Sequence, residues 1–276
     1  MLFKSSVPTP EAWDQVMRDG APDVWRPKSG EHPGLAMMRP HIEGARSFLD
    51  VGASNGDLLA QLGGTADRLS ALDVVEYPRC RDILAGPGEY IIGQLDDGVE
   101  WSSDPYDIVT AFDVFEHFFN AGRAIANLLA FVKVGGRLIV ETGDWRSVPD
   151  PGEWYYTNIL EHQIFWTRET FDYLADQYPF SMATYARVNH KGRRSMGLPK
   201  RLALATIVRL APHPWFRRAM IAAGRDPGHF GAPRLVDHAF VVLERLGADQ
   251  ARAPLSNAGA RSRPLVPRSA ETRADT

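Results

Sequence analysis

A chain of 276 residues with 44% hydrophobic side chains can bury one substantial core with additions, or at most two small ones. The single cysteine, Cys80, excludes an intrachain disulfide framework, and we assign it no role. The amino end lacks the apolar segment of a secretion signal, and no stretch reaches the roughly 18 uncharged apolar residues of a membrane-spanning helix. We therefore expect a cytoplasmic protein.

Residues 1–45 are expected to form an N-terminal helical cap. Thr9 caps and Pro10 begins a predicted helix over residues 9–20, which ends at Gly20. Residues 21–34 are rich in turn-forming residues. This cap precedes the alternating pattern of the core.

Residues 46–190 alternate short apolar runs with longer helical patterns. Five runs have the length and the boundaries of buried strands, at 47–53, 68–75, 89–95, 106–112 and 136–143. Between the last two runs, apolar residues recur at helical spacing from Phe115 to Val132, before a Gly-Gly stop. Strands and helices that alternate in this way predict a parallel, doubly wound α/β sheet.

Two later strands, predicted at 180–190 and 237–247, are separated by a basic segment and are expected to be neighbours in space. Residues 191–234 carry ten basic residues and one acidic residue, a charge of +9 that leaves −12 for the rest of the chain, whose net charge is −3. Two helices are predicted inside this segment, which we interpret as an insertion. Residues 235–247 return to the core, and residues 248–276 lack periodicity and are expected to be disordered.

The first predicted strand leads into a turn with two glycines, Gly52 and Gly56. A dinucleotide-binding turn has the pattern Gly-x-Gly-x-x-Gly, but here Asp50 stands two residues before Gly52, where a glycine is expected. A carboxylate there would repel a pyrophosphate and would suit a ligand with an ammonium group. The glycines are expected to let the chain pass close to that ligand.

The stretch Asp50 to Gly56, DVGASNG, resembles the first motif of the class I S-adenosylmethionine (SAM)-dependent methyltransferases. The resemblance spans roughly residues 47–180 and, more weakly, 237–246. It covers a subgroup of bacterial small-molecule methyltransferases, of the type 11, 12 and 23 kind. The resemblance implies a Rossmann-like, doubly wound, seven-stranded and mostly parallel sheet with an antiparallel final strand, and a helical insertion before that strand.

The resemblance also implies the residues that hold SAM. Asp73, at the end of the second strand, would accept hydrogen bonds from both ribose hydroxyls, with Glu76 as the alternative. Gln94 stands where the family usually has an acid near the adenine, and Asp96 takes that role if the register shifts. The remaining candidates lie at the carboxyl end of the fourth strand, where ligands gather in open α/β sheets: Phe112 and Asp113.

Two histidines are candidates for a general base, because imidazole titrates near neutral pH. His162 lies in a predicted aromatic-rich loop and is the first choice, and His117 begins the helix after the fourth strand. Either histidine can instead be structural. Four aromatic residues are expected to line the acceptor pocket, although such clusters are often ordinary core: Trp145, Tyr155, Tyr156 and Trp166, with Trp154 beside them.

No metal is predicted. Asp113 and Asp144 end neighbouring strands and would suit the magnesium site of a catechol-type enzyme, but Trp145 stands where such an enzyme has an asparagine. The sequence therefore predicts transfer without a cation.

The sequence thus predicts SAM-dependent methyl transfer to a small-molecule or glycosidic acceptor, at oxygen, with a histidine base. The alternatives are transfer to carbon or nitrogen, a catalytically silent SAM-binding protein and, disfavoured by Asp50, a nicotinamide oxidoreductase. The basic segment 191–234 is a lid, an anionic-substrate funnel or a peripheral membrane contact that would suit a lipid-linked acceptor. Nucleic acid is not expected as a partner, because the core lacks a basic stripe with interleaved aromatic residues.

Overall fold

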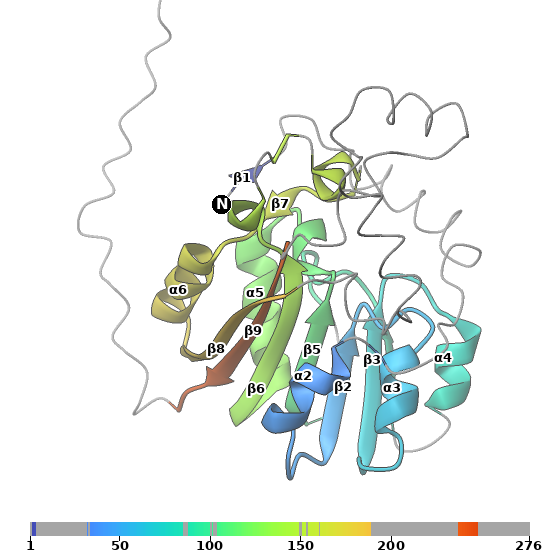
Figure 1. Ribbon diagram of the computed structural model, residues 1–276. Helices are drawn as coiled ribbons and strands as arrows, with labels where there is room; N and C mark the ends of the chain where they lie inside the picture. Colours follow the sequence, from blue (N-terminus) through green and yellow to red (C-terminus); the bar gives the residue numbers. More distant parts are fainter. Residues whose placement is uncertain are drawn as a thin grey trace, which may run out of the picture.

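The computed structural model describes residues 2–3, 32, 34–84, 88–99, 101, 104–148, 151–152, 154–159, 161–188 and 237–247. Seven strands form the main sheet in the order β4-β3-β2-β5-β6-β9-β8 (Figure 1). They are β2 (Ser47–Val51), β3 (Arg68–Asp73), β4 (Tyr90–Ile92), β5 (Tyr106–Phe112), β6 (Val132–Gly143), β8 (Phe180–Val188) and β9 (His238–Arg245). A separate two-stranded pair joins β1 (Leu2–Phe3) to β7 (Ile164–Phe165).

The directions of the strands confirm the predicted sheet. β2 pairs in parallel with β3 and β5, and β6 extends the parallel set. β9 lies between β6 and β8 and is antiparallel to both of them. The two late strands of the sequence are therefore neighbours, as predicted, and the final strand is the antiparallel one.

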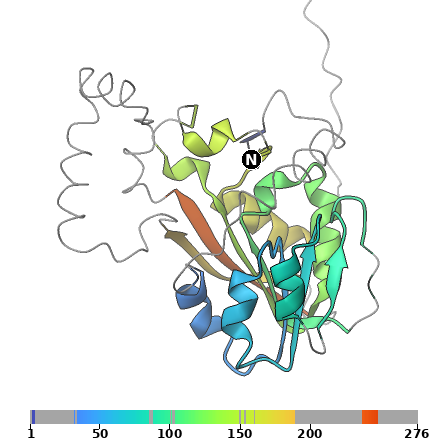
Figure 2. The ribbon, with the colours of Figure 1, turned by 90° about the vertical axis from the view of Figure 1, so that its right-hand side faces the viewer.

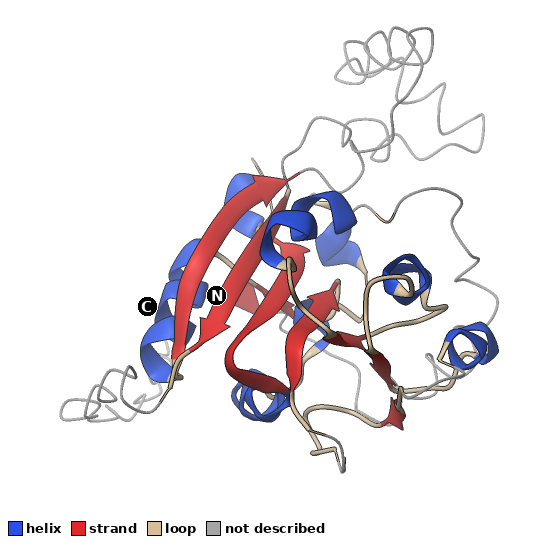
Figure 3. Ribbon diagram, turned by 90° about the horizontal axis from the view of Figure 1, so that it is seen from below, coloured by secondary structure: helices blue, strands red, loops and turns tan. Residues whose placement is uncertain are grey.

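Helices cover both faces of this sheet (Figure 3). α5 (Ala121–Phe131) and α6 (Arg168–Gln177) bury apolar side chains in the core cluster of one face, while α2 (Leu35–Met38), α3 (Asp57–Leu62) and α4 (Pro78–Ile83) pack on the other. Short 3-10 turns complete the set: η1 (Arg39–His41), η2 (Phe115–His117), η3 (Trp145–Ser147) and η4 (Tyr155–Asn158). In Figures 1 and 2 the yellow-green segment after β6 lies above the carboxyl ends of the parallel strands.

The helix after β5 is shorter than its apolar spacing predicts. Residues 115–117 form the turn η2, Phe118 is extended, and α5 begins only after Asn120, whose side chain accepts a hydrogen bond from the backbone nitrogen of Arg123 at 3.1 Å. At its other end, Val132 already pairs with Tyr106 as the first residue of β6. The apolar spacing continues beyond both ends of α5, but the cap at Asn120 sets its first turn and the pairing of Val132 in β6 ends it.

The turn glycine Gly52 is required by its backbone and by its neighbour. Its φ is +70°, and a Cβ atom there would lie 2.5 Å from Cγ2 of Val114. Gly44 has a similar φ of +78° with open space around it. We expect Gly44→Ala to lower the free energy of unfolding by about 1 kcal/mol, the cost of the left-handed backbone alone, and Gly52→Ala to cost about 2 kcal/mol more through overpacking.

Urea unfolding of both variants measures that difference. An equal decrease in the free energy of unfolding for Gly44→Ala and Gly52→Ala would mean that the Val114 side chain moves away from the added methyl group. Only the backbone conformation would then require a glycine at this turn.

Several predicted segments lie outside the described residues. They are the helix at 9–20, the two helices of the basic insertion at 191–234 and the tail at 248–276. The strand pair of Leu2–Phe3 with Ile164–Phe165 is an addition to the helical cap expected for residues 1–45. Among the described helices, none has the length and apolar character needed to cross a membrane.

Candidate active site

Asp50 is the penultimate residue of β2, at the carboxyl edge of the parallel strands, and is 6% exposed. Its Oδ1 accepts a hydrogen bond from the Thr110 hydroxyl of β5 at 2.6 Å. Burial, together with the nearby charge of Asp73, raises the pKa of Asp50 to about 7 against the effect of that hydrogen bond. A buried carboxylate of this kind is stabilised when a cation is placed beside it.

Asp73 ends the neighbouring strand β3 and holds the glycine turn. Its Oδ2 accepts a hydrogen bond from the backbone nitrogen of Ser54 at 2.8 Å, and its Oδ1 accepts one from Val74 at 2.8 Å. Burial raises the pKa of Asp73 to about 6, although these backbone hydrogen bonds oppose the shift. Ser54 has a positive φ of 49°, so the turn places this N–H toward the carboxylate.

Gly56 begins α3 in the left-handed region, with a φ of +72°. A Cβ atom at Gly56 would lie 3.0–3.2 Å from atoms of Cys80 and Ile83 on α4. The described residues therefore explain both glycines of the turn by backbone conformation and by close packing against protein side chains. The sequence also predicts that these glycines let the chain pass close to the cofactor, and this stays a prediction.

The two candidates near the adenine differ in their contacts. Asp96 is buried, and its Oδ2 accepts hydrogen bonds from the backbone nitrogens of Phe119 at 2.5 Å and Asn120 at 2.9 Å. Gln94 is half-buried in the turn after β4, with its carbonyl accepting from Asp97. Asp96 thus joins this turn to the start of α5, whereas the side chain of Gln94 makes no such structural hydrogen bond to the described residues.

Glu76, the alternative to Asp73, forms an ion pair with Arg81 at 2.8 Å, and both side chains are more than 40% exposed. It therefore lies on the surface beside α4, while the carboxylate of Asp73 is buried in the turn. The structure brings Asp73, and not Glu76, next to the residues 52–56.

Phe112 ends β5, and Asp113 follows it directly. The ring of Phe112 is stacked on His32 at 5.5 Å between centroids, and it packs where a Cβ atom on Gly34 would otherwise lie. Asp113 has a φ of +53°, and its Oδ1 accepts a hydrogen bond from the Tyr156 hydroxyl at 3.2 Å. Phe112 and Asp113 therefore face different neighbours, although they are adjacent in the chain.

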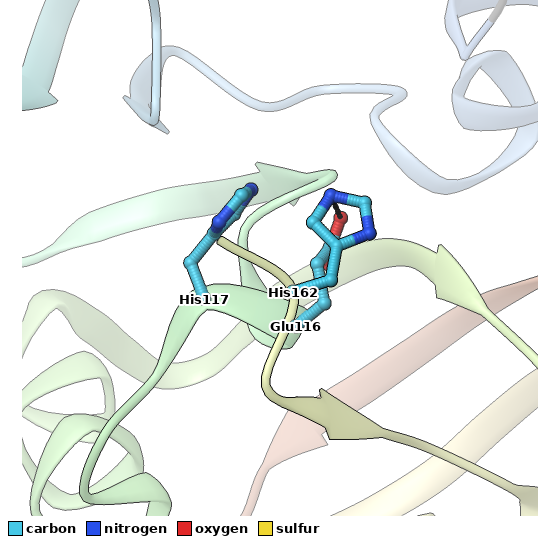
Figure 4. A group of neighbouring side chains, drawn as sticks. All are labelled: Glu116, His117 and His162. Atoms are coloured by element: carbon cyan, nitrogen blue, oxygen red, sulfur yellow. Dashed lines mark ion pairs between the residues drawn. The ribbon is translucent and has the colours of Figure 1, made fainter. Parts of the chain in front are cut away.

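Figure 4 shows the two candidate histidines beside a buried acid, with the side chains of Glu116, His117 and His162 projecting to the same side of the ribbon. The rings of His117 and His162 are 4.8 Å apart between centroids, and Nε2 of His162 lies 3.9 Å from Oε1 of Glu116. We call these three residues the Glu-His-His cluster. η2 contributes Glu116 and His117, and the loop before β7 contributes His162.

Glu116 is fully buried, and its carboxylate is held by two hydroxyls. Its Oε2 accepts a hydrogen bond from Thr142 of β6 at 2.7 Å, and its Oε1 accepts one from Tyr156. Burial and the charge of Asp113 raise the pKa of Glu116. The Tyr156 hydroxyl thus lies between two carboxylates, those of Glu116 and Asp113.

Each histidine of the cluster has one ring nitrogen beside a backbone carbonyl. Nδ1 of His162 lies 3.0 Å from the oxygen of Tyr156, and Nδ1 of His117 lies 3.2 Å from the oxygen of Glu161. A carbonyl oxygen can only accept, so in both rings the hydrogen bond requires the proton on Nδ1. In the neutral rings Nε2 is then the unprotonated nitrogen.

The predicted pocket aromatics divide into two groups. Tyr156 and Trp154 are stacked at 4.8 Å over the ends of β6 and β9, with Trp145 packed against their cluster. Trp166 is fully buried in the core with Phe115 and Phe171, and its Nε1 donates to the oxygen of Phe115 at 2.9 Å. The side chain of Tyr155 lies outside the described residues.

Asp144, considered above for a magnesium site with Asp113, is fully buried and already paired. Its Oδ2 accepts hydrogen bonds from Tyr185 and Arg187, each at 2.9 Å, and its Oδ1 accepts one from the backbone nitrogen of Arg146. Asp113 instead lies beside His238, at 3.5 Å from its Nε2. Burial lowers the pKa of His238, but Asp113 and Asp237 outweigh this effect and raise it to about 10.

Four residues of this region were not singled out as functional by the sequence. Glu116 had one available signal, its position beside His117 shortly after a predicted strand. Thr110, Thr142 and His238 lie within predicted strands and look like ordinary strand residues in the sequence. Only the register of β2, β5, β6 and β9 brings them to one edge.

The fold and the positions of these carboxylates agree with a methyltransferase. A family model described as "Methyltransferase domain" matches residues 28–184, more than half of the chain. The chain therefore belongs to this family, within the class I SAM-dependent methyltransferases, and it is an enzyme that uses SAM.

Solved structures share the fold at low sequence identity. They include the Burkholderia thailandensis 1,6-didemethyltoxoflavin-N1-methyltransferase with S-adenosylhomocysteine (SAH) bound, at 15% identity and a TM-score of 0.57 over 88% of this chain and 93% of that one. The N-methyltransferase NodS of Bradyrhizobium japonicum, also with SAH, is 11% identical, with a TM-score of 0.52 over 84% of this chain and 97% of that one. The [4+2]-cyclase SpnF is 15% identical, with a TM-score of 0.54 over 87% of this chain and 98% of that one. A comparison with curated proteins gives no match.

Proposed function

We propose that the enzyme transfers the methyl group of SAM to a hydroxyl of a small-molecule acceptor, including the hydroxyl of a glycoside, at the Glu-His-His cluster. The observation that carries this proposal is the pair of imidazoles whose Nδ1 atoms lie 3.0 and 3.2 Å from backbone carbonyls. In the neutral rings this arrangement leaves Nε2 unprotonated, and both histidines lie near the end of β5, which Asp113 follows directly. His162 is the first choice for the group that takes the hydroxyl proton.

The chemistry explains why a proton acceptor is useful there. The methyl carbon of SAM is activated by the positive sulfur, so the protein has to align the acceptor oxygen and help to remove its proton. As the O–C bond forms, the C–S bond breaks, its electron pair stays on sulfur, and the hydroxyl proton passes to Nε2 of the histidine. A positioned base contributes about 10²–10⁴-fold to such a step.

We assign the cofactor to the carboxyl ends of β2, β3 and β5. The buried carboxylate of Asp50 fits the cationic amino group of SAM. Its pKa is raised because burial destabilises the ionised form, and a cation beside it would stabilise that form. Asp73 would accept from the ribose hydroxyls while it holds the turn of Gly52 and Gly56. Gln94 and Asp96 both stay candidates beside the adenine. Oδ2 of Asp96 serves two backbone nitrogens, whereas its buried Oδ1 has no hydrogen-bond partner among the described residues and could accept from the adenine amino group.

The proposal is tested by binding and by transfer. Calorimetric titration with SAM, SAH and NADH should show binding of the two sulfur ligands and none of NADH. A screen of hydroxyl acceptors with methyl-labelled SAM should then give turnover, and His162→Ala should lower that turnover by about 100-fold or more while SAH still binds. Transfer to amine acceptors alone, or binding of SAM with no transfer to any acceptor, would contradict oxygen methylation.

A further inference from the structure

The Glu-His-His cluster has the composition of a metal-binding site. Glu116, His117 and His162 each offer one ligand atom, and these atoms all lie within 4.8 Å of one another. Two imidazoles and one carboxylate are also the protein ligands of several catalytic zinc sites, which keep a further position open. With metal–ligand distances of about 2.1 Å, the ligand atoms of a tetrahedral site lie roughly 3.4 Å apart, so small side-chain rotations would close this cluster.

The orientation of both histidines fits the same role. A histidine that binds a metal usually donates its other ring N–H to a carbonyl or a carboxylate, which fixes the ring and the tautomer. Nδ1 of His117 lies 3.2 Å from the Glu161 oxygen, and Nδ1 of His162 lies 3.0 Å from the Tyr156 oxygen. The two rings lie on different chain segments and have the same support, which leaves Nε2 as the unprotonated nitrogen in each neutral ring. Nε2 of His162 lies 3.9 Å from Oε1 of Glu116.

The third ligand is supported in the same manner. The Thr142 hydroxyl holds Oε2 of Glu116 at 2.7 Å, and Tyr156 donates to Oε1. Tyr156 also donates to Asp113 at 3.2 Å, so its single hydroxyl serves two carboxylates. The side chain of Asp113 is 35% exposed and lies beside His238, whereas Glu116 is fully buried with two hydroxyls on its carboxylate. A cation beside Glu116 would offset the charge of that buried carboxylate.

We propose that Glu116, His117 and His162 bind one divalent transition-metal cation of the zinc type. Imidazole ligands favour zinc and its neighbours over magnesium or calcium, which prefer oxygen. This inference departs from the absence of a metal that the sequence predicts, because the third ligand and the supporting carbonyls come together only in the fold.

The consequence for catalysis rests on the proposed function. An acceptor hydroxyl would bind at the open position of the cation, which lowers the pKa of that hydroxyl and lets its proton pass to solvent water. The resulting oxygen attacks the methyl carbon, the C–S bond breaks, and SAH leaves with the electron pair on sulfur. In this form of the reaction His162 is a metal ligand, and the cation replaces it in activating the hydroxyl.

The test is metal binding by the purified full chain after treatment with a chelator. Titration with Zn²⁺ should show one site, and Co²⁺ at the same site should give the visible absorption of a coordinated ion. His117→Ala, at a half-buried position, should weaken Zn²⁺ by about 100-fold, and His162→Ala should do the same. Thr142→Val removes only the hydroxyl that holds Glu116, so about tenfold weaker binding is expected. His41→Ala, on the separate turn η1, is the matched histidine control and should bind as the parent does.

SAH binding is measured on every variant to report folding and the cofactor site. Loss of the Zn²⁺ site in His117→Ala with SAH affinity unchanged would support the inference. No stoichiometric site in the parent, or Zn²⁺ binding that survives both histidine substitutions, would overturn it and would leave the methyl-transfer proposal standing. Conversely, a Zn²⁺ site that follows these residues in a protein without transfer to hydroxyls would support the metal and refute the oxygen acceptor.

Discussion

Asp50→Asn is expected to weaken SAM and SAH by about 30-fold at pH 8, which corresponds to the loss of about 2 kcal/mol for a hydrogen bond to a charged group. The substitution is a mild one, since the asparagine Oδ1 can still accept the hydrogen bond that Thr110 donates at 2.6 Å. What it removes is the negative charge that we assign to the ammonium group of the cofactor. Isothermal titration calorimetry of the parent and the variant measures the difference.

A ligand without the ammonium group makes this test specific. 5′-Methylthioadenosine keeps the adenine, the ribose and the sulfur but lacks the amino acid, so its affinity should be nearly the same for the parent and Asp50→Asn. An equal loss for SAH and methylthioadenosine would place the effect on the turn as a whole, and it would refute the contact between Asp50 and the ammonium group.

The raised pKa of Asp50 gives the same binding a pH dependence. With a pKa of about 7, the carboxyl is mostly ionised at pH 8 and mostly protonated at pH 6. Since the ammonium group requires the ionised form, affinity for SAH should fall by about tenfold between pH 8 and pH 6 in the parent. In Asp50→Asn the affinity should not change over this range.

Stability is expected to change in the opposite direction. The folded pKa of Asp50 lies above its ordinary value of 3.8, so ionisation costs folding free energy as the pH rises from about 4 to 7. Asp50→Asn removes that cost, and the unliganded variant should be more stable than the parent at pH 8 by up to about 4 kcal/mol, with little of that gain near pH 4. The unliganded parent thus has a lower free energy of unfolding because it keeps a buried carboxylate where the ammonium group is to bind.

The sequence was informative wherever the structural cause is local. Buried runs such as 106–112 became strands because short apolar stretches between turn formers have few alternatives, and the positions of Asp50 and Asp73 at strand ends follow directly from those strands. The antiparallel final strand was available only through the family resemblance, since periodicity does not reveal direction. The start of α5 was misplaced, because Phe115 and Phe118 continue the helical spacing while Asn120 provides the cap.

The Glu-His-His cluster was only partly predictable, for a different reason. His117 and His162 were recognised by residue type, but the 44 residues between them in the sequence do not reveal how far apart the two rings lie in the fold. Glu116 looked like an ordinary polar neighbour of His117. The fold determines its role, because Thr142 comes from β6 and Tyr156 from η4. Conversely, Trp166 was placed in the acceptor pocket on aromatic character alone, whereas its burial among Phe115 and Phe171 follows from the packing of α6.

Asp73→Ala is expected to weaken every ligand that carries the ribose, in contrast to Asp50→Asn. Two hydrogen bonds from hydroxyls to a buried carboxylate are worth about 3 kcal/mol together, so SAM, SAH and 5′-methylthioadenosine should each lose about 100-fold in affinity. Glu76→Gln is the matched control, since Glu76 is the alternative acid and lies in an exposed ion pair with Arg81. It should leave all three affinities unchanged, and a loss in Glu76→Gln without one in Asp73→Ala would transfer the ribose contact to Glu76.

The same substitution separates binding from the support of the turn. In Asp73→Ala the backbone N–H groups of Ser54 and Val74 lose their acceptor, which costs about 1–3 kcal/mol for each group that stays buried. The folded pKa of about 6 lies above 3.8, so the parent gains stability from Asp73 at low pH and loses that gain as the pH rises through 6. The variant should therefore be less stable than the parent at pH 4.5, and the difference should shrink by pH 8. If the affinity loss disappears at a temperature well below the unfolding midpoint of Asp73→Ala, Asp73 only supports the turn and does not bind the ribose.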